Sequence, residues 1–191
     1  ITVLGKDVSK YNTKKMRKMP IGYIPADRNH AALVLDFSLQ QNVALNHPDQ
    51  PPYGNRWVMN HRKITQVTEE KLRQFHVAAS GPAEQARNLS GGNQQKVVLA
   101  REVGEKVDLI IAVYPTRGLD IDATHFVFDT MLKARDEGAA VLYISTELEE
   151  ILSVSDRIGV LYEGTLMGII PGEGAQVEKI GLMMAGEQVA E

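Results

Sequence analysis

The stretch from residue 107 to residue 170 alternates between apolar runs and helical patterns, and this alternation constrains the fold more than any other feature. Residues 107–113 form a nearly continuous apolar run, and residues 139–145 form a second one. Such runs are typical of strands buried on both faces of a sheet. A third strand is expected at 157–162, and helices at 123–137 and 147–152 separate the strands. Strand, helix and strand in this order predict an α/β protein with a mostly parallel sheet.

The first half of the sequence predicts short strands and helices. Strands are expected at both ends of residues 1–25, with a turn at residues 5–7 and a basic stretch that we interpret as a solvated helix face. A short helix follows at 40–45, capped by Ser38, and an amphipathic helix at 60–75. We interpret Trp57, the only tryptophan, as a local packing residue rather than an anchor for a partner. The remaining expected elements are a strand at 165–170 after a Glu-Gly turn and a tail helix at 177–185.

Composition excludes several functional classes. With 191 residues and 43% hydrophobic content, the chain can bury one core and a small subdomain. A net charge of −3 argues against nucleic acid as the main partner. There are no cysteines, and the five histidines show no metal-ligand spacing, so we predict no metal of the protein's own. No apolar run approaches the ~18 residues of a membrane span, and we expect a soluble, cytoplasmic protein.

Residues 89–96, Leu-Ser-Gly-Gly-Asn-Gln-Gln-Lys, predict a helix start that can hold an anion. Ser90 is a good N-cap, and Gly91 and Gly92 would let a ligand approach the backbone. Asn93 adds a side-chain amide donor. The unpaired amides and the positive end of the helix dipole would then face a phosphate group. On spacing alone, an ordinary capped helix after a glycine-rich loop is an equally good interpretation.

The same eight residues resemble the signature motif of ATP-binding-cassette (ABC) ATPases, in the branch that imports sugars and nucleosides. Residues 115–120 resemble the end of that family's Walker B segment and its D-loop, and residues 23–28 resemble the segment around the Q-loop in second cassettes. The resemblance covers nearly the whole chain. It implies a P-loop NTPase-like α/β core with a mostly parallel sheet and a small helical subdomain.

The resemblance also implies a division of the chain into four segments. Residues 1–30 would be N-terminal strands of the cassette core, and residues 31–90 a helical subdomain that ends in the signature motif. Residues 91–170 would form the α/β core, with residues 171–191 as a C-terminal tail helix. The outer surface of the helical subdomain, roughly residues 26–60, would dock a membrane permease.

Several positions depart from the family pattern. The sequence has no Gly-x-x-x-x-Gly-Lys-Ser/Thr, so we expect a fragment that lacks the Walker A loop and binds ATP poorly by itself. Val113 stands at the position of the magnesium-side Asp, and Tyr114, with a reference pKa of ~10, at that of the general base. Ala26 replaces the Q-loop Gln, and Thr146 replaces the switch His. We therefore assign no catalytic residue and predict that this fragment alone is inactive.

The resemblance implies a degenerate second cassette of an importer for a simple sugar or a nucleoside, at the cytoplasmic face of the membrane. Residues 90–93 would meet the γ-phosphate of ATP, which is bound with magnesium mainly by the first cassette of the same or a sister chain. Asp120 would contact that partner cassette.

Two alternatives stay open: an active ATPase that uses Tyr114 or Glu147 as base, and a non-hydrolytic regulatory module on a cassette scaffold. The residues leave the cargo open, with a nucleoside slightly favoured by the look of residues 111–118.

Overall fold

The computed structural model describes residues 1–187, which divide into two units, Ile1–Ile144 and a second unit from Ser145 onward. The elements of the first unit, in chain order, are β1 (Thr2–Val3), β2 (Lys6–Asp7), α1 (Thr13–Met16), β3 (Ile21–Ile24), the π-helical turn η1 (Arg28–Ala32), α2 (Leu39–Ala44), α3 (His61–Gln74), the 3-10 turn η2 (Ala86–Asn88), α4 (Gly91–Glu102), β4 (Leu109–Val113), α5 (Ile121–Asp136) and β5 (Ala140–Ile144). The second unit holds α6 (Leu148–Val154), β6 (Arg157–Tyr162), β7 (Thr165–Pro171) and α7 (Val177–Met184).

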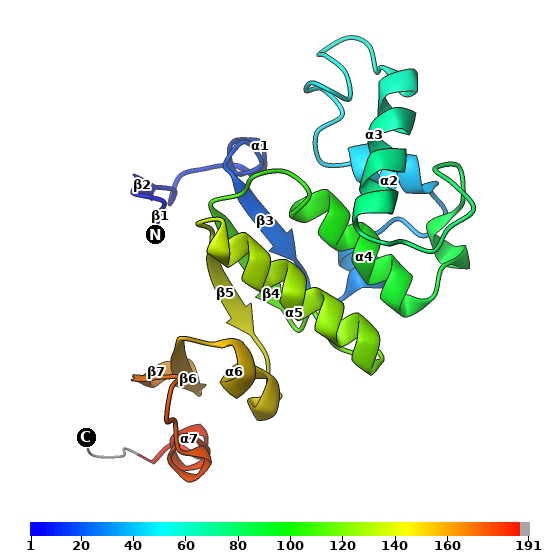
Figure 1. The fold of residues 1–191 in the computed structure, drawn as a ribbon. Coiled ribbons are helices and arrows are strands. Elements are labelled where there is room, and N and C mark those ends of the chain that lie inside the picture. Colours follow the sequence, from blue (N-terminus) through cyan, green and yellow to red (C-terminus); the bar gives the residue numbers. More distant parts are fainter. Residues whose placement is uncertain (188–191) are drawn as a thin grey trace. The chain divides into compact units, whose positions relative to one another are not determined.

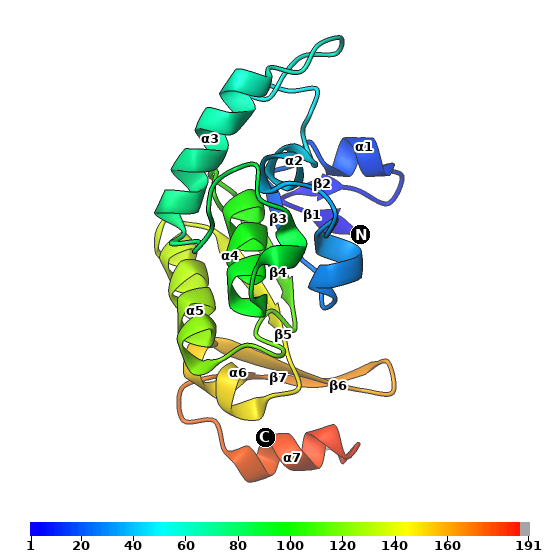
Figure 2. The ribbon, with the colours of Figure 1, turned by 90° about the vertical axis from the view of Figure 1, so that its right-hand side faces the viewer.

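A three-stranded parallel sheet forms the centre of the first unit. Its order is β3-β4-β5, with Ile24 opposite Ala112 and Ala112 opposite Tyr143. Helices α4 and α5 lie on the same side of this sheet (Figures 1 and 2). Ile24, Ile110 and Ala112 on that face are fully buried. The α/β class and the parallel sheet predicted from the sequence are therefore confirmed.

The prediction that residues 107–113 and 139–145 are buried on both faces is wrong, because the opposite face of the sheet is partly exposed. Burial alternates along β4, and Leu142 and Ile144 of β5 are 51% and 39% exposed. Tyr23 of β3, in the same row as Leu142, is 51% exposed. The reason is that α4 and α5 cover one face only, and side chains on a strand alternate between faces.

Helices α2, α3 and α4 pack beside one another next to the sheet. Ser38 caps α2, as predicted, and the structure adds a capping box with Gln41. Asn60 caps α3 by accepting a hydrogen bond from the Lys63 amide. Helix α5 begins two residues earlier than predicted because the Asp120 carboxylate caps it. The predicted helices at 40–45, 60–75 and 123–137 are confirmed to within two residues at each end.

Trp57 does not pack locally, and that interpretation is wrong. Its side chain is 83% exposed on the long loop between α2 and α3. The turn that carries it is closed by backbone hydrogen bonds to the Asn55 side chain, which leave the indole ring on the outside.

The second unit is an antiparallel hairpin with two helices. The third strand predicted for the parallel sheet, at 157–162, is instead β6 of a two-stranded antiparallel sheet, where it pairs with β7 across a two-residue turn. Glu163 and Gly164 both have positive φ, 45° and 79°, which is the backbone of a tight hairpin turn. Ile180 and Met183 of α7 pack with Ile158 and Val160 of β6 in a small core of their own.

Candidate functional site

The start of α4 is the surface on which the predicted site residues gather. Ser90 is the N-cap, and its Oγ accepts hydrogen bonds from the Asn93 amide at 3.4 Å and from Asn93 Nδ2 at 3.0 Å. Asn93 Oδ1 accepts in turn from the Ala78 amide at 2.8 Å. Asn93 thus joins the serine to the loop before it and fixes the rotamer of an exposed hydroxyl.

The first-turn amides of Gly91 and Gly92 are free to bind an anion. None of the hydrogen bonds formed within residues 1–187 uses either amide as donor. They lie at the positive end of a 12-residue helix, beside the exposed Ser90 hydroxyl. Uncompensated first-turn amides and the helix dipole favour a phosphate or carboxylate at this position.

The two glycines also have a packing role that the sequence does not reveal. A Cβ on Gly91 would lie 2.7 Å from Nη2 of Arg28, and a Cβ on Gly92 would lie 3.1 Å from the Ala123 side chain. Arg28 donates from Nη1 to the Arg117 carbonyl at 3.0 Å. Arg28 therefore lies against the start of α4 and is hydrogen-bonded to the loop before α5. The sequence places it in the segment that resembles the Q-loop region but does not predict these contacts.

Asp120 lies close to the same helix start. Its Oδ1 accepts from the Ala123 amide at 2.8 Å and so caps α5. Its other oxygen, Oδ2, would be 3.9 Å from a Cβ on Gly92. Asp120 itself is exposed, so a helix cap and an outward-facing carboxylate are combined in one residue.

The far end of α4 is anchored by a buried ion pair. Arg101 Nε and Glu102 Oε1 are 2.7 Å apart, and the two side chains are 6% and 8% exposed. Arg101 also donates to the Ala32 carbonyl, and Glu102 accepts from Asn46 Nδ2 at 2.7 Å and from the Tyr23 amide at 3.2 Å. These bonds tie the helix to the sheet and to the loop after α2, which fixes where its other end points.

A second anchor is Lys71 of α3. Its Nζ donates to the Ala100 carbonyl at 2.8 Å near the end of α4, and it lies 3.9 Å from Glu105. Burial lowers the pKa of Lys71, and the nearby acidic groups act in the opposite direction. A cation at the C-terminal end of a helix is also favourable to the helix dipole.

The end of β4 carries no group suited to metal chemistry. Val113 is its last residue and is half-buried; its side chain has no atom that can ligate Mg²⁺. Tyr114 follows with φ of +47°, and its amide donates to the Ile144 carbonyl at 2.8 Å. This left-handed backbone is unusual for a large side chain and costs of order 1 kcal/mol. The anion-binding features at α4 thus have no metal-binding counterpart at Val113 and Tyr114.

The two remaining predicted positions are exposed. Ala26 follows β3 and presents only a methyl group. Next to it, Asp27 caps η1 and accepts from His30, and this hydrogen bond lowers the pKa of Asp27. Thr146 belongs to the second unit, where it lies between β5 and α6.

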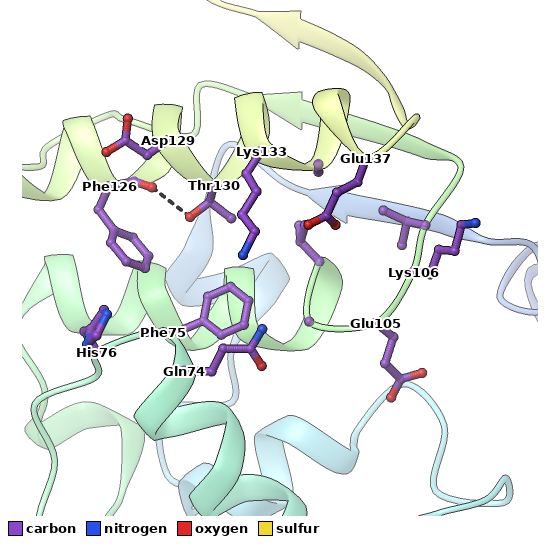
Figure 3. A pocket seen from close by; sticks show the side chains of 14 residues that line it. Gln74, Phe75, His76, Glu105, Lys106, Phe126, Asp129, Thr130, Lys133 and Glu137 are labelled. Carbon is purple, nitrogen blue, oxygen red and sulfur yellow. Dashed lines mark hydrogen bonds between the residues drawn. The ribbon is translucent and has the colours of Figure 1, made fainter.

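A cavity of 660 Å³ lies elsewhere in the first unit, among the ends of α3 and α4 and one face of α5. Phe75 and Phe126 form its apolar wall, and Lys133 points into it toward Phe75 (Figure 3). Its lining includes none of the predicted site residues, and acidic and basic groups both surround it.

Residues 1–187 contain neither a candidate metal cluster nor a membrane-spanning helix. No group of three or more histidine, aspartate or glutamate side chains there could hold a metal ion. Every helix in that range is too short or too polar to span a lipid bilayer.

Comparison with known proteins gives relatives along the full chain. A protein family described as ABC transporter matches residues 1–117. The nucleoside import ATP-binding protein NupA of Lactococcus lactis subsp. cremoris (strain MG1363) is 38% identical over all of this chain and 38% of its own length. The guanosine import ATP-binding protein NupO of Bacillus subtilis (strain 168) is 38% identical over 97% of this chain and 36% of its own. The ribose import ATP-binding protein RbsA of the same strain is 33% identical over 97% and 37%. The chain thus spans less than two fifths of the length of these relatives.

Solved structures give the same fold. A dimeric post-hydrolysis state of the ATP-binding cassette MJ0796, bound to ADP and Pi, superposes with a TM-score of 0.73 at 21% identity. The match covers 91% of this chain and 73% of that one. A second dimeric structure of MJ0796 gives a TM-score of 0.68 at 22% identity, covering 85% and 67%.

Proposed function

Because this chain belongs to the ABC transporter family, we propose that it is part of the ATP-binding subunit of an importer for nucleosides or ribose-like sugars. In this proposal it is the degenerate second cassette, and it supplies its signature segment to an ATP site held mainly by a partner cassette. The partner is the first cassette of the same or a sister chain, and a permease binds the helical subdomain at the cytoplasmic face of the membrane.

One observation carries the proposal. The cassette has an exposed helix start that suits an anion, but its strand β4 ends without a carboxylate. Ser90 and the free amides of Gly91 and Gly92 suit a phosphate group. Val113 and Tyr114 do not suit a magnesium ion or a general base at neutral pH. The chain therefore has the part of an ATP site that contacts a phosphate and lacks the part that activates water.

Each of these residues has a separate role in the proposed ATP site. Ser90 and the first amides of α4 bind the γ-phosphate, and Asn93 holds the serine hydroxyl in place through its side-chain amide. Asp120 faces the partner cassette while it caps α5. ATP with Mg²⁺, bound mainly by the partner, supplies the reacting phosphate. If both cassettes share one polypeptide, their effective concentration is in the ~mM range.

A nucleoside is the favoured cargo. Two relatives at 38% identity are named for nucleoside and guanosine import, whereas the ribose import protein of Bacillus subtilis is 33% identical. The RbsA proteins nonetheless keep a ribose-like sugar as the second candidate, since the cargo is chosen by components other than this chain.

The test is Ser90→Arg in the assembled two-cassette transporter. The arginine would place a long side chain where the γ-phosphate has to lie, so we expect ATP hydrolysis and uptake to fall by at least about 100-fold, as when an important transition-state contact is lost. Gln66→Arg, which adds the same charge to an exposed position of α3, is the matched control and should behave as the wild type. Labelled guanosine and labelled ribose, offered to the same vesicles, distinguish the two cargoes. Normal hydrolysis and uptake by Ser90→Arg would contradict the proposal.

A further inference from the structure

Residues 55–63, which we call the tip, are an exposed turn with the start of α3. The tip belongs to the loop that projects from the N-terminal end of α3 (Figures 1 and 2). Three consecutive apolar side chains lie on it, and their exposed fractions are 83% for Trp57, 66% for Val58 and 41% for Met59. Apolar side chains gathered in this way on a surface mark an interaction site.

The tip is held in shape by its own hydrogen bonds. Asn55 Oδ1 accepts from the Trp57 amide at 2.9 Å and from the Val58 amide at 3.0 Å, and the Asn55 amide donates to the Val58 carbonyl. The Asn60 amide donates to the carbonyl of Tyr53, whose side chain is buried. The apolar side chains therefore point to solvent from a turn that is hydrogen-bonded to a residue of the core.

The charge of the tip is opposite to that of the chain. Arg56, Arg62 and Lys63 give the tip three positive charges, and no aspartate or glutamate occurs from residue 50 to residue 68, although the chain carries −3. All three are exposed, and within residues 1–187 none of them forms an ion pair. The Arg56 guanidinium lies 5.3 Å from the centre of the Trp57 ring.

The position of these charges is unfavourable for the isolated chain. Arg62 and Lys63 lie in the first turn of α3, at the positive end of its dipole, and no acidic residue in that turn compensates them. The negative charge of an anionic partner would attract both the basic side chains and the positive end of the helix dipole, and would offset this repulsion. The tip thus combines exposed apolar side chains with three basic side chains that form no ion pair within residues 1–187.

We propose that the tip binds the surface of an anionic lipid membrane, with Trp57, Val58 and Met59 among the headgroups and Arg56, Arg62 and Lys63 on the lipid phosphates. Tryptophan favours this interface because its ring is apolar and its N–H can still donate. The inference rests on the proposed function, which places the chain at the cytoplasmic face of the membrane. That leaflet is anionic and so complements the three basic side chains of the tip. In this arrangement the permease occupies the part of the 26–60 surface that precedes the tip, and lipid occupies the tip.

The test uses Trp57 as the reporter, because it is the only tryptophan in the chain. The protein is titrated, without nucleotide or permease, with vesicles of phosphatidylcholine alone or mixed equally with phosphatidylglycerol. With the anionic vesicles we expect a blue shift of Trp57 emission and quenching by brominated lipid tails. Each basic residue near an anionic surface contributes about fivefold, so the triple variant Arg56→Gln/Arg62→Gln/Lys63→Gln should bind roughly 100-fold more weakly.

A second triple variant is the matched control. Lys14→Gln/Arg17→Gln/Lys18→Gln removes the same number of exposed charges around α1 and should bind as the wild type. In vesicle flotation, Trp57→Ala should lose about tenfold in binding, since it removes a large apolar ring from the interface.

Three results would overturn the inference: unchanged emission with every vesicle, equal binding to both lipid mixtures, or equal losses for the two triple variants. The first would point to a protein groove as the partner. None of these results depends on ATP, so a failed lipid test would leave the proposed role of Ser90 standing, and the reverse also holds.

Discussion

At the scale of single residues, two glycines in and near α4 differ in the atoms that an added side chain would meet. A Cβ on Gly91 would meet the end of the flexible Arg28 side chain, which can move away. A Cβ on Gly104, just beyond α4, would lie 2.1 Å from the backbone oxygen of Ala100 and 2.7 Å from Nζ of Lys71. The helix carbonyl cannot move without breaking the bond that Lys71 makes to it.

These contacts predict opposite outcomes for two matched substitutions. Gly104→Ala should destabilise the first unit by about 3 kcal/mol, the cost of forcing extra atoms into a packed site. Gly91→Ala should change the free energy of unfolding by less than about 1 kcal/mol, since alanine is favoured over glycine in a helix. Urea unfolding followed by circular dichroism measures both. A cost for Gly91→Ala equal to that for Gly104→Ala would show that the Arg28 contact is rigid.

Local rules predicted some site residues and missed others. Ser90 as a helix cap follows from its hydroxyl and the glycines after it, because capping depends on three or four neighbouring residues. No local pattern predicts the role of Arg28, because its contacts are with residues about 60 and 90 positions away, Gly91 and Arg117. Trp57 was misjudged for a related reason: its exposure is set by the turn that Asn55 closes.

At the scale of elements, helices were predicted well and strand environments were not. Caps at Ser38, Asn60 and Ser90 fix where helices begin. The apolar runs at β4 and β5 do not say how many faces of a strand are covered, since that depends on where α4 and α5 pack. The pairing of β6 with β7 could have been inferred from its two-residue turn, which allows only an antiparallel return.

Helix α2 offers an element-scale test. Asn42 is fully buried; its Oδ1 accepts from the Val34 amide, and its Nδ2 donates to the carbonyls of Val34, Phe37 and Ser38. Asn42→Leu keeps the number of side-chain heavy atoms but removes the partner of the Val34 amide, whereas each of the three carbonyls still accepts a backbone N–H. We therefore expect a loss of about 1–3 kcal/mol in urea unfolding. Gln66→Leu, at an exposed position of α3, is the control and should change little. An unchanged midpoint for Asn42→Leu would mean that the Val34 amide finds another partner.

At the scale of the whole molecule, the proposed function depends on a second cassette. The fold and family were recognised from three short motifs, because those motifs carry phosphate contacts and loop geometry that few other chains share. Sequence and structure agree on an exposed helix start at Ser90 and on a β4 end without carboxylates.

The most direct measurement is photolabelling of the two-cassette assembly with ATP that carries a photoreactive group on its γ-phosphate. We expect peptide mapping to place the label within residues 90–93, and to find it there only when the partner cassette is present. The Ser90→Arg variant should lose it. Label at these residues of equal strength without the partner, or none in the assembled and hydrolysing transporter, would contradict the account.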